Sequence, residues 1–546
     1  MTETKERTAP EKDRDRSHWA DHAARRVLDF VNPSASSPIT VAAGITPSGV
    51  IHVGNFREVI TVDLVARALQ DRGVEVRFIY SWDDFDVFRK VPVDMPRPEM
   101  LEENLRRSVA DVPDPYADHE SYAAHFIAQF EGSLVPLGIM PEFIRQSKRY
   151  RVGAYAAGIR KALEERDAIR QILNRHRTRP LPDDWLPLAG FCDACGRDEV
   201  DYCWPGDWNV EYRCRRCEHE ASVDLREGGN IKLPWRIDWP MRWSQEQVVF
   251  EPGGKDHSSA GGSFDTGREI VSQVYAGKPP EYVAYDFVRI KGRGGKISSS
   301  KGDVVTVQDC LDVYEPEMLR WIFASQRPGS EFQISFDADV IKLYEDYDRA
   351  RRLAHEAEDG SKADKKRRIA RRTFELASVS PCRIEPGSSA PAAPPFRAVS
   401  VVVQAYDGDL DRTVSHFERL GEMSGDKERA LCRERAACCW RWVQGFAPEE
   451  FRYRIRKQAV ARSVEGDHRI VLQRLVEVLK SQPDWAEADL VPHMKGLCDG
   501  TELTLKTFCP LAYDLLVERD HGPKLTTLLT TMGSERALPL LEPSLG

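Results

Sequence analysis

The sequence predicts an α/β protein, with a parallel sheet in the first part of the chain and an all-helical region after it. The main observation is a strand, turn, helix and strand in succession near the N-terminus. Pro38–Ile45 is apolar and β-branched, which is typical of a buried parallel strand. Apolar residues recur at helical spacing from Phe56 to Gln70, and Val74–Tyr80 predicts the second strand. These elements form a βαβ unit, whose two strands are parallel.

The length and composition indicate a soluble protein with more than one core. The chain has 546 residues, of which 41% are hydrophobic and 30% charged, whereas single cores stop growing at about 250–300 residues. It contains no apolar run of about 18 residues, so we expect no membrane span. Residues 1–17 are charged, lack the apolar core of a signal peptide and predict a disordered extension of a cytoplasmic protein. The net charge of −9 does not exclude nucleic-acid binding, because a local basic patch suffices for phosphate contacts.

The other elements are predicted in chain order. A helix is expected from Trp19 to Phe30, and strands near Val248–Phe250 and Tyr282–Ile290. We therefore place the α/β domain at residues 18–310. The pattern loosens at about 91–230, which we interpret as an insertion with a cysteine-rich part at about 190–220. Helices are expected over 311–378 and 397–546, joined by a Pro-, Ser- and Ala-rich linker at 379–396.

The first candidate functional segment is TPSGVIHVGN, residues 46–55, at the turn between the first strand and its helix. Ligands of open α/β sheets bind at the carboxyl ends of strands, where helix N-termini offer N–H groups to phosphate. A surface turn requires only Pro47, Ser48 and Gly49. His52 and Asn55, which follow it, therefore indicate a ligand.

The second segment is RIKGRGGKISSSKGDVVTV, residues 289–307. It contains three glycines, then Lys296 and Lys301, with Ser298, Ser299 and Ser300 between them. A flexible, cationic loop rich in hydroxyl groups suits the β- and γ-phosphates of ATP. The alternative interpretation is a solvated hairpin loop.

Together the two segments resemble the HIGH and KMSKS signatures of class I aminoacyl-tRNA synthetases. The blocks TPSGVIHVGNFRE, DDFDVFRKVP, PWRIDWPMRW, GGKDHSSAGGS and KISSSKG resemble, in order, those of the class I lysyl-tRNA synthetases. The resemblance is strong over about 18–345 and weaker beyond. Asn55 replaces the last His of HIGH and Ser299 the second Lys of KMSKS, as is usual in the lysyl branch. We expect Lys301 to supply the missing charge.

The resemblance implies a Rossmann-type catalytic domain that makes lysyl-adenylate from lysine and ATP with Mg²⁺. The lysyl group then passes to the 2′-hydroxyl at the 3′ end of tRNA(Lys). His52 and Asn55 would hydrogen-bond the phosphates in the transition state, and Lys296 and Lys301 would hold the departing pyrophosphate. The expected nucleotide-binding residues are Gly49, Gly54, Ser298, Ser299 and Ser300.

The family pattern places the lysine pocket at Gly44, Thr46, Trp235, His257 and Tyr285. Trp235 and Tyr285 could clamp the aliphatic stem or meet the ammonium by cation–π contact. A core position is the alternative for Trp235. The ammonium also requires a carboxylate, and the sequence leaves Asp83, Asp84 and Asp238 as candidates.

Two clusters have metal-ligand character. Cys192 and Cys195 form one Cys-x-x-Cys pair, and Cys214 and Cys217 form a second at zinc-ribbon spacing, which predicts a structural Zn²⁺. A weaker cluster comprises Asp114, Asp118, His119 and His125. The family often has a second zinc site here, with a cysteine where Asp118 stands. The alternative is a solvated loop.

The helical regions are the candidates for tRNA contact. The resemblance implies that residues 397–546 bind the anticodon and that 311–378 approach the tRNA stem, where KKRRIARR (365–372) could supply positive charge. The alternative for this basic run is a solvated helix face. Aromatics such as Trp442 and Phe508 could stack on anticodon bases or belong to the core. Two other functions remain open: a paralogue that makes a lysyl conjugate or confers inhibitor tolerance, and a non-catalytic tRNA-binding protein. The sequence predicts no oligomeric state.

Overall fold

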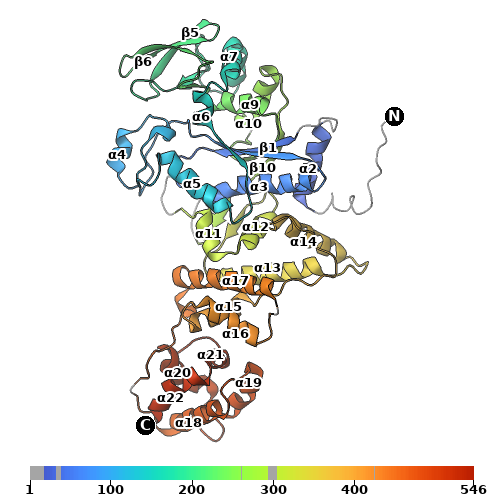
Figure 1. Ribbon diagram of the computed structural model, residues 1–546, viewed down its shortest axis with the longest axis vertical. Helices are drawn as coiled ribbons and strands as arrows, with labels where there is room; N and C mark the ends of the chain where they lie inside the picture. The colour runs from blue at the N-terminus through green and yellow to red at the C-terminus, as the bar shows by residue number, and fades with distance from the viewer. Residues whose placement is uncertain (1–17, 32–37, 260, 293–303, 424, 461) are drawn as a thin grey trace. The chain divides into compact units, whose positions relative to one another are not determined.

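A computed structural model describes residues 18–31, 38–259, 261–292, 304–423, 425–460 and 462–546 (Figure 1). The predicted N-terminal extension, residues 1–17, lies outside these ranges. The chain divides into two compact units. Unit 1 comprises the described residues up to Cys310 together with Pro316–Ile334 and Glu358–Glu385, and unit 2 comprises Leu311–Glu315, Ser335–Ala357 and Pro386–Gly546. The segment 311–378 is thus shared between the units, and the functional domains drawn from the sequence remain predictions.

The described part of unit 1 contains a five-stranded sheet in the order β10-β9-β1-β2-β3, with every pair parallel. Its strands are β1 (Ile39–Ile45), β2 (Val76–Trp82), β3 (Glu142–Arg145), β9 (Val248–Gly254) and β10 (Glu281–Tyr285). The chain proceeds outward from β1 to β3, then returns to the other side of β1 with β9. Such a reversal leaves a crevice at the carboxyl ends of β1 and β9, where ligands of doubly wound sheets bind. The predicted α/β fold is confirmed.

Helices cover both faces of this sheet (Figure 1). On one face lie α2 (Trp19–Phe30) and α3 (Val53–Gln70), and on the other α9 (Trp235–Gln245) and α10 (Ser263–Gln273). The indoles of Trp239 and Trp243 in α9 pack on Ala42, Ile79 and Val248 from the strands. This buried apolar contact fixes α9, and therefore its first residue, Trp235, against the crevice.

The strand predicted at Tyr282–Ile290 is wrong in one respect, because it is two strands. β10 ends at Tyr285, and β11 (Val288–Ile290) pairs in parallel with β12 (Phe332–Ile334) in a separate ladder. Between them the Asp286 N–H donates to the carbonyl of Pro328 (2.9 Å) instead of continuing the first sheet. A continuous apolar run could not reveal this change of partner, since it depends on residues about 40 positions away.

The segment between β2 and α9 contains β3 of the main sheet, several helices and a three-stranded antiparallel sheet. The sheet consists of β5 (Val200–Gly206), β6 (Asn209–Cys214) and β7 (Glu220–Asp224). A short antiparallel pair, β4 (Ala189–Gly190) and β8 (Ile231–Lys232), brings together the two ends of the segment that holds this sheet. The α-helices between β2 and α9 are α4 (Pro98–Glu103), α5 (Tyr122–Leu134), α6 (Gln146–Arg151), α7 (Ala156–Glu164) and α8 (Arg166–Asn174).

The rest of the chain is helical, as the sequence predicts. Unit 1 also contains α12 (Pro316–Ala324) and α14 (Asp364–Ala377). The residues of α11 (Val307–Val313) up to Cys310 belong to unit 1 and the later ones to unit 2. Unit 2 holds α13 (Asp339–His355), α15 (Phe396–Ala405), α16 (Leu410–Arg419), α17 (Asp426–Gly445), α18 (Gly466–Ser481), α19 (Glu487–Gly496), α20 (Leu505–Val517), α21 (Leu525–Met532) and α22 (Ser534–Leu541). Among the residues described, none of these helices has the length and apolar character needed to cross a membrane.

Much of the positive charge of α14 is used within unit 1. Arg372 is buried and pairs with Asp21 (2.8 Å) and Asp71 (2.6 Å), while Arg371 pairs with Glu358 (2.7 Å). These arginines stabilise the position of α14. The exposed Lys365 and Lys366 are the charges of this run that face solvent.

Candidate active site

A cleft of about 940 Å³ opens at the carboxyl ends of β1, β9 and β10. It lies at the crevice that the sheet order predicts. Its lining includes nine residues that the sequence assigned to ATP or lysine: Gly44, Thr46, Gly49, His52, Gly54, Asn55, Trp235, His257 and Tyr285. These residues come from four separate segments of the chain, and the fold brings them to one cavity.

The HVGN segment forms the N-terminus of α3. His52 is the N-cap residue, with extended backbone, and its N–H donates to the side-chain oxygen of Asn55 (3.1 Å). Asn55 therefore caps the helix through its oxygen, which directs its amide group, a donor, away from that bond. A Cβ at Gly54 would lie 2.8 Å from Nδ1 of His52, so the glycine leaves room for the imidazole.

The chain returns to this helix end after the second signature. Val53 N–H donates to the carbonyl of Val305 (2.9 Å), and Thr306 forms an isolated antiparallel bridge with His52. Lys296, Ser298, Ser299, Ser300 and Lys301 lie outside the described residues, within the gap from 293 to 303. The described chain thus resumes beside His52, immediately after that segment.

Glu58, which the sequence analysis missed, lies on the floor of the cleft one turn and a half beyond His52. Its carboxylate accepts from the N–H of Gly44 (2.9 Å) and from the hydroxyl of Tyr285 (2.7 Å). Burial raises the pKa of Glu58 to about 7. Buried apolar residues of α3, Phe56 and Val59, flank Glu58. A carboxylate at such a position of a buried helix is uncommon, so the sequence could have indicated a functional role for Glu58.

A second acidic group faces the cleft from the segment after β2. Asp86 accepts from the hydroxyl of Thr46 (2.8 Å) and pairs with the ammonium of Lys232 (2.7 Å). Lys232 is 7% exposed and also donates to the carbonyl of Phe85 (3.1 Å). Although burial opposes its charged form, Asp86 and Asp238 raise the pKa of Lys232. Thr46 was predicted from the sequence, whereas its partner Asp86 and the Lys232 that pairs with Asp86 were not.

The three carboxylates that the sequence left as candidates are all engaged within the protein. Asp84 accepts from the N–H (2.8 Å) and the hydroxyl (2.7 Å) of Ser147. Asp83 pairs with Arg242 (2.8 Å), and Asp238 pairs with the same guanidinium (3.2 Å) and accepts from Tyr150. Of these three, Asp83 lines the cleft.

The remaining lysine-pocket candidates form the walls of the cleft. Trp235 stacks on Trp239, with ring centroids 5.1 Å apart and planes at 15°. His257 is exposed at the mouth, with its ring centroid 6.4 Å from that of Trp235. A Cβ at Gly44 would lie 2.7 Å from the carbonyl oxygen of Ser81, so β1 and β2 require a glycine there.

Comparison with known proteins identifies the family. Residues 17–380 match the family described as tRNA synthetases class I (K). The chain belongs to the class I (K) tRNA synthetases. A lysine–tRNA ligase of Borreliella burgdorferi is 42% identical over 523 residues, covering 95% of this chain and 98% of the relative. Those of Treponema pallidum and Pyrococcus furiosus are each 38% identical, covering 95% of this chain and 97% and 98% of their own. The family resemblance drawn from the sequence is confirmed.

Among solved structures, a glutamate–tRNA ligase from Elizabethkingia meningosepticum aligns with a TM-score of 0.43 and 15% identity. The alignment covers 93% of this chain and 99% of that one. This likeness is too slight to add to the assignment, which rests on the sequence comparisons.

Four cysteines of this class I synthetase converge in the insertion. The sulfurs of Cys192 and Cys217 are 3.6 Å apart and those of Cys195 and Cys214 3.7 Å, and all four lie within 4.8 Å of one another. Tetrahedral thiolates at about 2.3 Å from Zn²⁺ are roughly 3.8 Å apart, so the set fits a structural zinc. Cys203 and His219 do not belong to this group.

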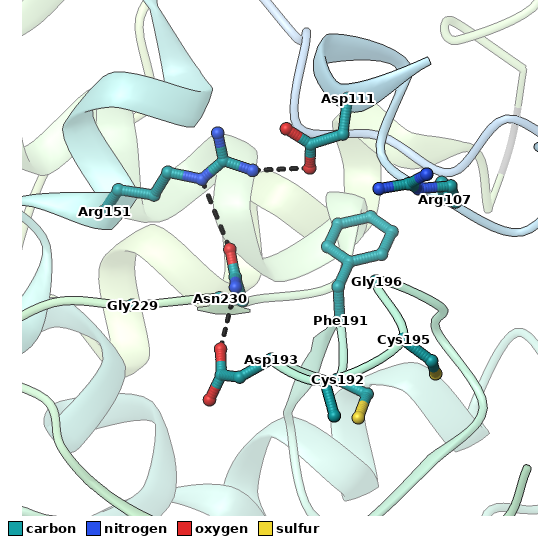
Figure 2. Close-up of a pocket in the computed structure, with 11 residues that line it drawn as sticks. Arg107, Asp111, Arg151, Phe191, Cys192, Asp193, Cys195, Gly196, Gly229 and Asn230 are labelled. Atoms are coloured by element: carbon teal, nitrogen blue, oxygen red, sulfur yellow. Dashed lines mark hydrogen bonds and ion pairs between the residues drawn. The ribbon is translucent and has the colours of Figure 1, made fainter. Parts of the chain in front are cut away.

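The first knuckle, Cys192–Gly196, borders a cavity of about 620 Å³ (Figure 2). There Arg151 of α6 donates to Asp111 (2.6 Å) and to Asn230 (3.2 Å), which in turn donates to Asp193 in the knuckle (2.8 Å). Phe191, next to Cys192, lines both this cavity and the larger cleft. The cysteine site therefore adjoins the wall of the cleft.

The second predicted metal cluster is brought together in part. Asp114, His119 and His125 have ligand atoms within 4.8 Å of one another, and Asp118 does not belong to this group. The backbone N–H groups of Asp118 (2.8 Å) and His119 (2.9 Å) donate to Asp114, whose Oδ2 is 3.4 Å from Nδ1 of His125. A carboxylate and two imidazoles are suitable zinc ligands, and they leave a fourth position open.

Proposed function

We propose that this protein is a lysine–tRNA ligase, which activates lysine with ATP and transfers it to the 3′ end of tRNA(Lys). The observation that carries the proposal is the pairing, in one cleft, of the His52 helix N-terminus with two carboxylates, Glu58 and Asp86. A helix N-terminus favours phosphate, and Glu58 favours one ammonium group of lysine. The oxygen of Thr46, whose hydrogen is donated to Asp86, can accept from the other ammonium group. The relatives named lysine–tRNA ligase support the same substrate.

ATP would bind with its phosphates at the start of α3. The N-terminal end of α3 and the imidazole of His52 would face the α-phosphate, and Asn55 would add its amide donor. Gly49 and Gly54 would permit close approach of the nucleotide. Lys296, Lys301 and the hydroxyls of Ser298, Ser299 and Ser300 would contact the β- and γ-phosphates. The bound Mg²⁺ would neutralise part of the phosphate charge.

Lysine would lie along the floor of the cleft, with its ε-ammonium on Glu58 and its α-ammonium on Thr46. Glu58 contacts Gly44, two residues deeper along β1 than Thr46, which directly precedes the phosphate-binding turn. Since the α-ammonium neighbours the reacting carboxylate, it belongs at the end nearer the phosphates. Trp235 and Tyr285 would enclose the aliphatic stem, and His257 would close the mouth.

The first step joins lysine to AMP. A carboxylate oxygen of lysine attacks the α-phosphorus, and the bond to the bridging oxygen breaks, so pyrophosphate leaves with the electron pair. In the second step the 2′-hydroxyl of the terminal ribose attacks the acyl carbon, and AMP leaves. No protein nucleophile is required, so His52, Asn55, Lys296 and Lys301 act by positioning and charge stabilisation.

Zinc would have a structural role. Cys192, Cys195, Cys214 and Cys217 would hold one Zn²⁺ with no position left for water, which excludes it from the reaction centre. Asp114, His119 and His125 would hold a second Zn²⁺, with water or another group in place of Asp118. Total metal analysis distinguishes these sites: about two zincs per chain supports both, and one rejects the second.

The tRNA would contact both units. Unit 2 is the candidate anticodon-binding region, and the exposed Lys365 and Lys366 of α14 are candidates for stem contact. Trp442 and Phe508 are fully buried and therefore cannot stack on a base. The interpretation of these two rings as core residues is thus the better one.

The test is ATP–pyrophosphate exchange with each of the twenty amino acids, with and without a tRNA(Lys) transcript. The proposal expects lysine alone to stimulate exchange, and charging of the transcript in a subsequent assay. Lysine-dependent exchange without charging would favour the paralogue that makes a lysyl conjugate. Absence of exchange with every amino acid, in both conditions, would reject the enzyme in favour of the non-catalytic tRNA-binding protein.

A further inference from the structure

Lys232 is a resident ammonium group inside the cleft proposed for lysine. It lies in β8, whose backbone pairs with Ala189 of β4, so the return of the insertion fixes its position. The side chain is almost fully buried and points to Asp86 (2.7 Å) and to the carbonyl of Phe85 (3.1 Å). Removing an ammonium group from water costs free energy unless the group is paired, so burial of Lys232 depends on its contact with Asp86.

The pair determines how Thr46 can interact with a ligand. A hydroxyl group has one hydrogen to donate and two lone pairs. Thr46 gives its hydrogen to Oδ2 of Asp86, whose Oδ1 is held by Lys232. Toward the cleft, the oxygen of Thr46 can therefore only accept. An acceptor at this point suits an ammonium group and repels a carboxylate or phosphate oxygen.

Lys232 also prevents Asp86 from binding the substrate ammonium directly. Without it, Asp86 would present an unpaired carboxylate in a partly enclosed site and would compete with Glu58 for the cationic ends of lysine. With it, the charge of Asp86 is balanced. The contacts of Glu58 with the N–H of Gly44 and the hydroxyl of Tyr285 bring no positive charge to its carboxylate.

We propose that Lys232 and Asp86 form a positioning pair that presents the Thr46 hydroxyl as acceptor to the α-ammonium of lysine. This inference rests on the proposed function and extends it to two residues that contact no reacting atom. The pair sets the orientation of the substrate, so that the ε-ammonium reaches Glu58 and the carboxylate faces the α3 N-terminus.

Three variants test the pair: Lys232→Met, Asp86→Asn and the double variant. Lysine KM, ATP KM and kcat are measured by ATP–pyrophosphate exchange with tRNA(Lys) present, together with the melting temperature. We expect each single variant to raise the lysine KM by about 10-fold or more, as loss of one charge-assisted contact does, with the ATP KM unchanged. In Asp86→Asn the amide can donate to Thr46, which reverses the hydroxyl and opposes an ammonium.

The double variant separates positioning from stability. Replacing a buried ion pair with neutral groups of similar size usually preserves stability, whereas removing one partner does not. We therefore expect the double variant to regain the melting temperature that Lys232→Met loses, but to retain the raised lysine KM. If Lys232→Met fails to fold, the lysine KM is measured on Asp86→Asn instead, because this substitution keeps the shape of the side chain.

The matched control is Lys480→Met. Lys480 pairs with Glu542 (2.7 Å) but is exposed and belongs to unit 2, so the lysine KM of this variant should equal that of the wild type. Recovery of the wild-type lysine KM in the double variant would overturn the inference and leave the pair a structural one. Unchanged KM in both single variants would do the same. A wild-type protein without lysine-dependent exchange would instead overturn the proposed function itself, and the inference with it.

Discussion

Replacing Glu58 with Gln removes one negative charge from the floor of the cleft and keeps the shape of the side chain. The Gln oxygen can still accept from Gly44 N–H or from the Tyr285 hydroxyl, the two groups that contact Glu58. We therefore expect the variant to fold. Its deficit should appear in binding of the ε-ammonium, since a hydrogen bond to a charged group contributes about 1.5–3 kcal/mol. The lysine KM should rise by about 10- to 100-fold.

The pH dependence gives a sharper test. Burial raises the pKa of Glu58 to about 7, and only the ionised carboxylate binds an ammonium well. At about pH 6 roughly one molecule in ten is ionised, so the apparent affinity for lysine should be about 10-fold weaker than at about pH 8. In Glu58→Gln this dependence should disappear while the raised KM remains.

Folding stability should show the opposite trend. Because the pKa of Glu58 is higher in the folded protein than its ordinary value of 4.5, the folded state binds the proton more tightly. The stability contributed by this group is present below pH 4.5 and is lost as the pH rises through about 7. Without lysine, the free energy of unfolding of the wild type should therefore fall relative to Glu58→Gln over this interval, as denaturant titrations at several pH values would measure.

The assay is lysine-dependent pyrophosphate exchange with tRNA(Lys), from about pH 6 to pH 8, at saturating ATP. The control is Glu281→Gln, which removes a similar charge from the exposed pair with Arg26 (3.0 Å) and should leave both KM and its pH dependence unchanged. A Glu58→Gln variant with the lysine KM and pH profile of the wild type would refute the role assigned to this carboxylate.

Three other perturbations have defined outcomes. His52→Ala should lower the adenylation rate far more than it raises the ATP KM, measured by single-turnover kinetics, and an effect on KM alone would reject a transition-state role. Cys192→Ser should lower zinc content and the melting temperature, and raise lysine KM through the displaced Phe191 wall of the cleft; full zinc content by metal analysis would contradict the site. Arg57 donates to the carbonyls of Phe287, Arg327, Pro328 and Ser330, so Arg57→Met should lower the free energy of unfolding by about 3 kcal/mol or more, measured by denaturant titration. An unchanged unfolding midpoint would contradict that account.

Much of the fold could be predicted from local patterns. The βαβ unit is visible because β1 and α3 have distinct apolar periods and a polar turn between them, and these signals depend on neighbouring residues alone. The cluster of four cysteines could be predicted for the same reason, since each Cys-x-x-Cys pair is local and the β5–β6 hairpin brings the two pairs together.

The break between β10 and β11 and the role of α14 could not be predicted in this way. Both depend on partners distant in sequence: the carbonyl of Pro328 for Asp286, and the carboxylates of Asp21 and Asp71 for Arg372. A basic run has the same composition whether it faces RNA or folds back on acidic groups. Composition therefore indicated a nucleic-acid surface where the fold uses most of the arginines internally.

The sequence by itself determined the βαβ unit, its signature turn, the cysteine cluster and the family, because each is encoded in contiguous residues. The tertiary structure alone decided which charges face the cleft. Of the carboxylates in the sequence blocks, Asp84 and Asp238 are engaged elsewhere in the protein, and Asp83 lines the cleft but is paired with Arg242. Glu58 and the Lys232–Asp86–Thr46 chain also line the cleft. The physical reason is that the role of a carboxylate depends on whether another group already satisfies its charge, and that group can come from anywhere in the chain.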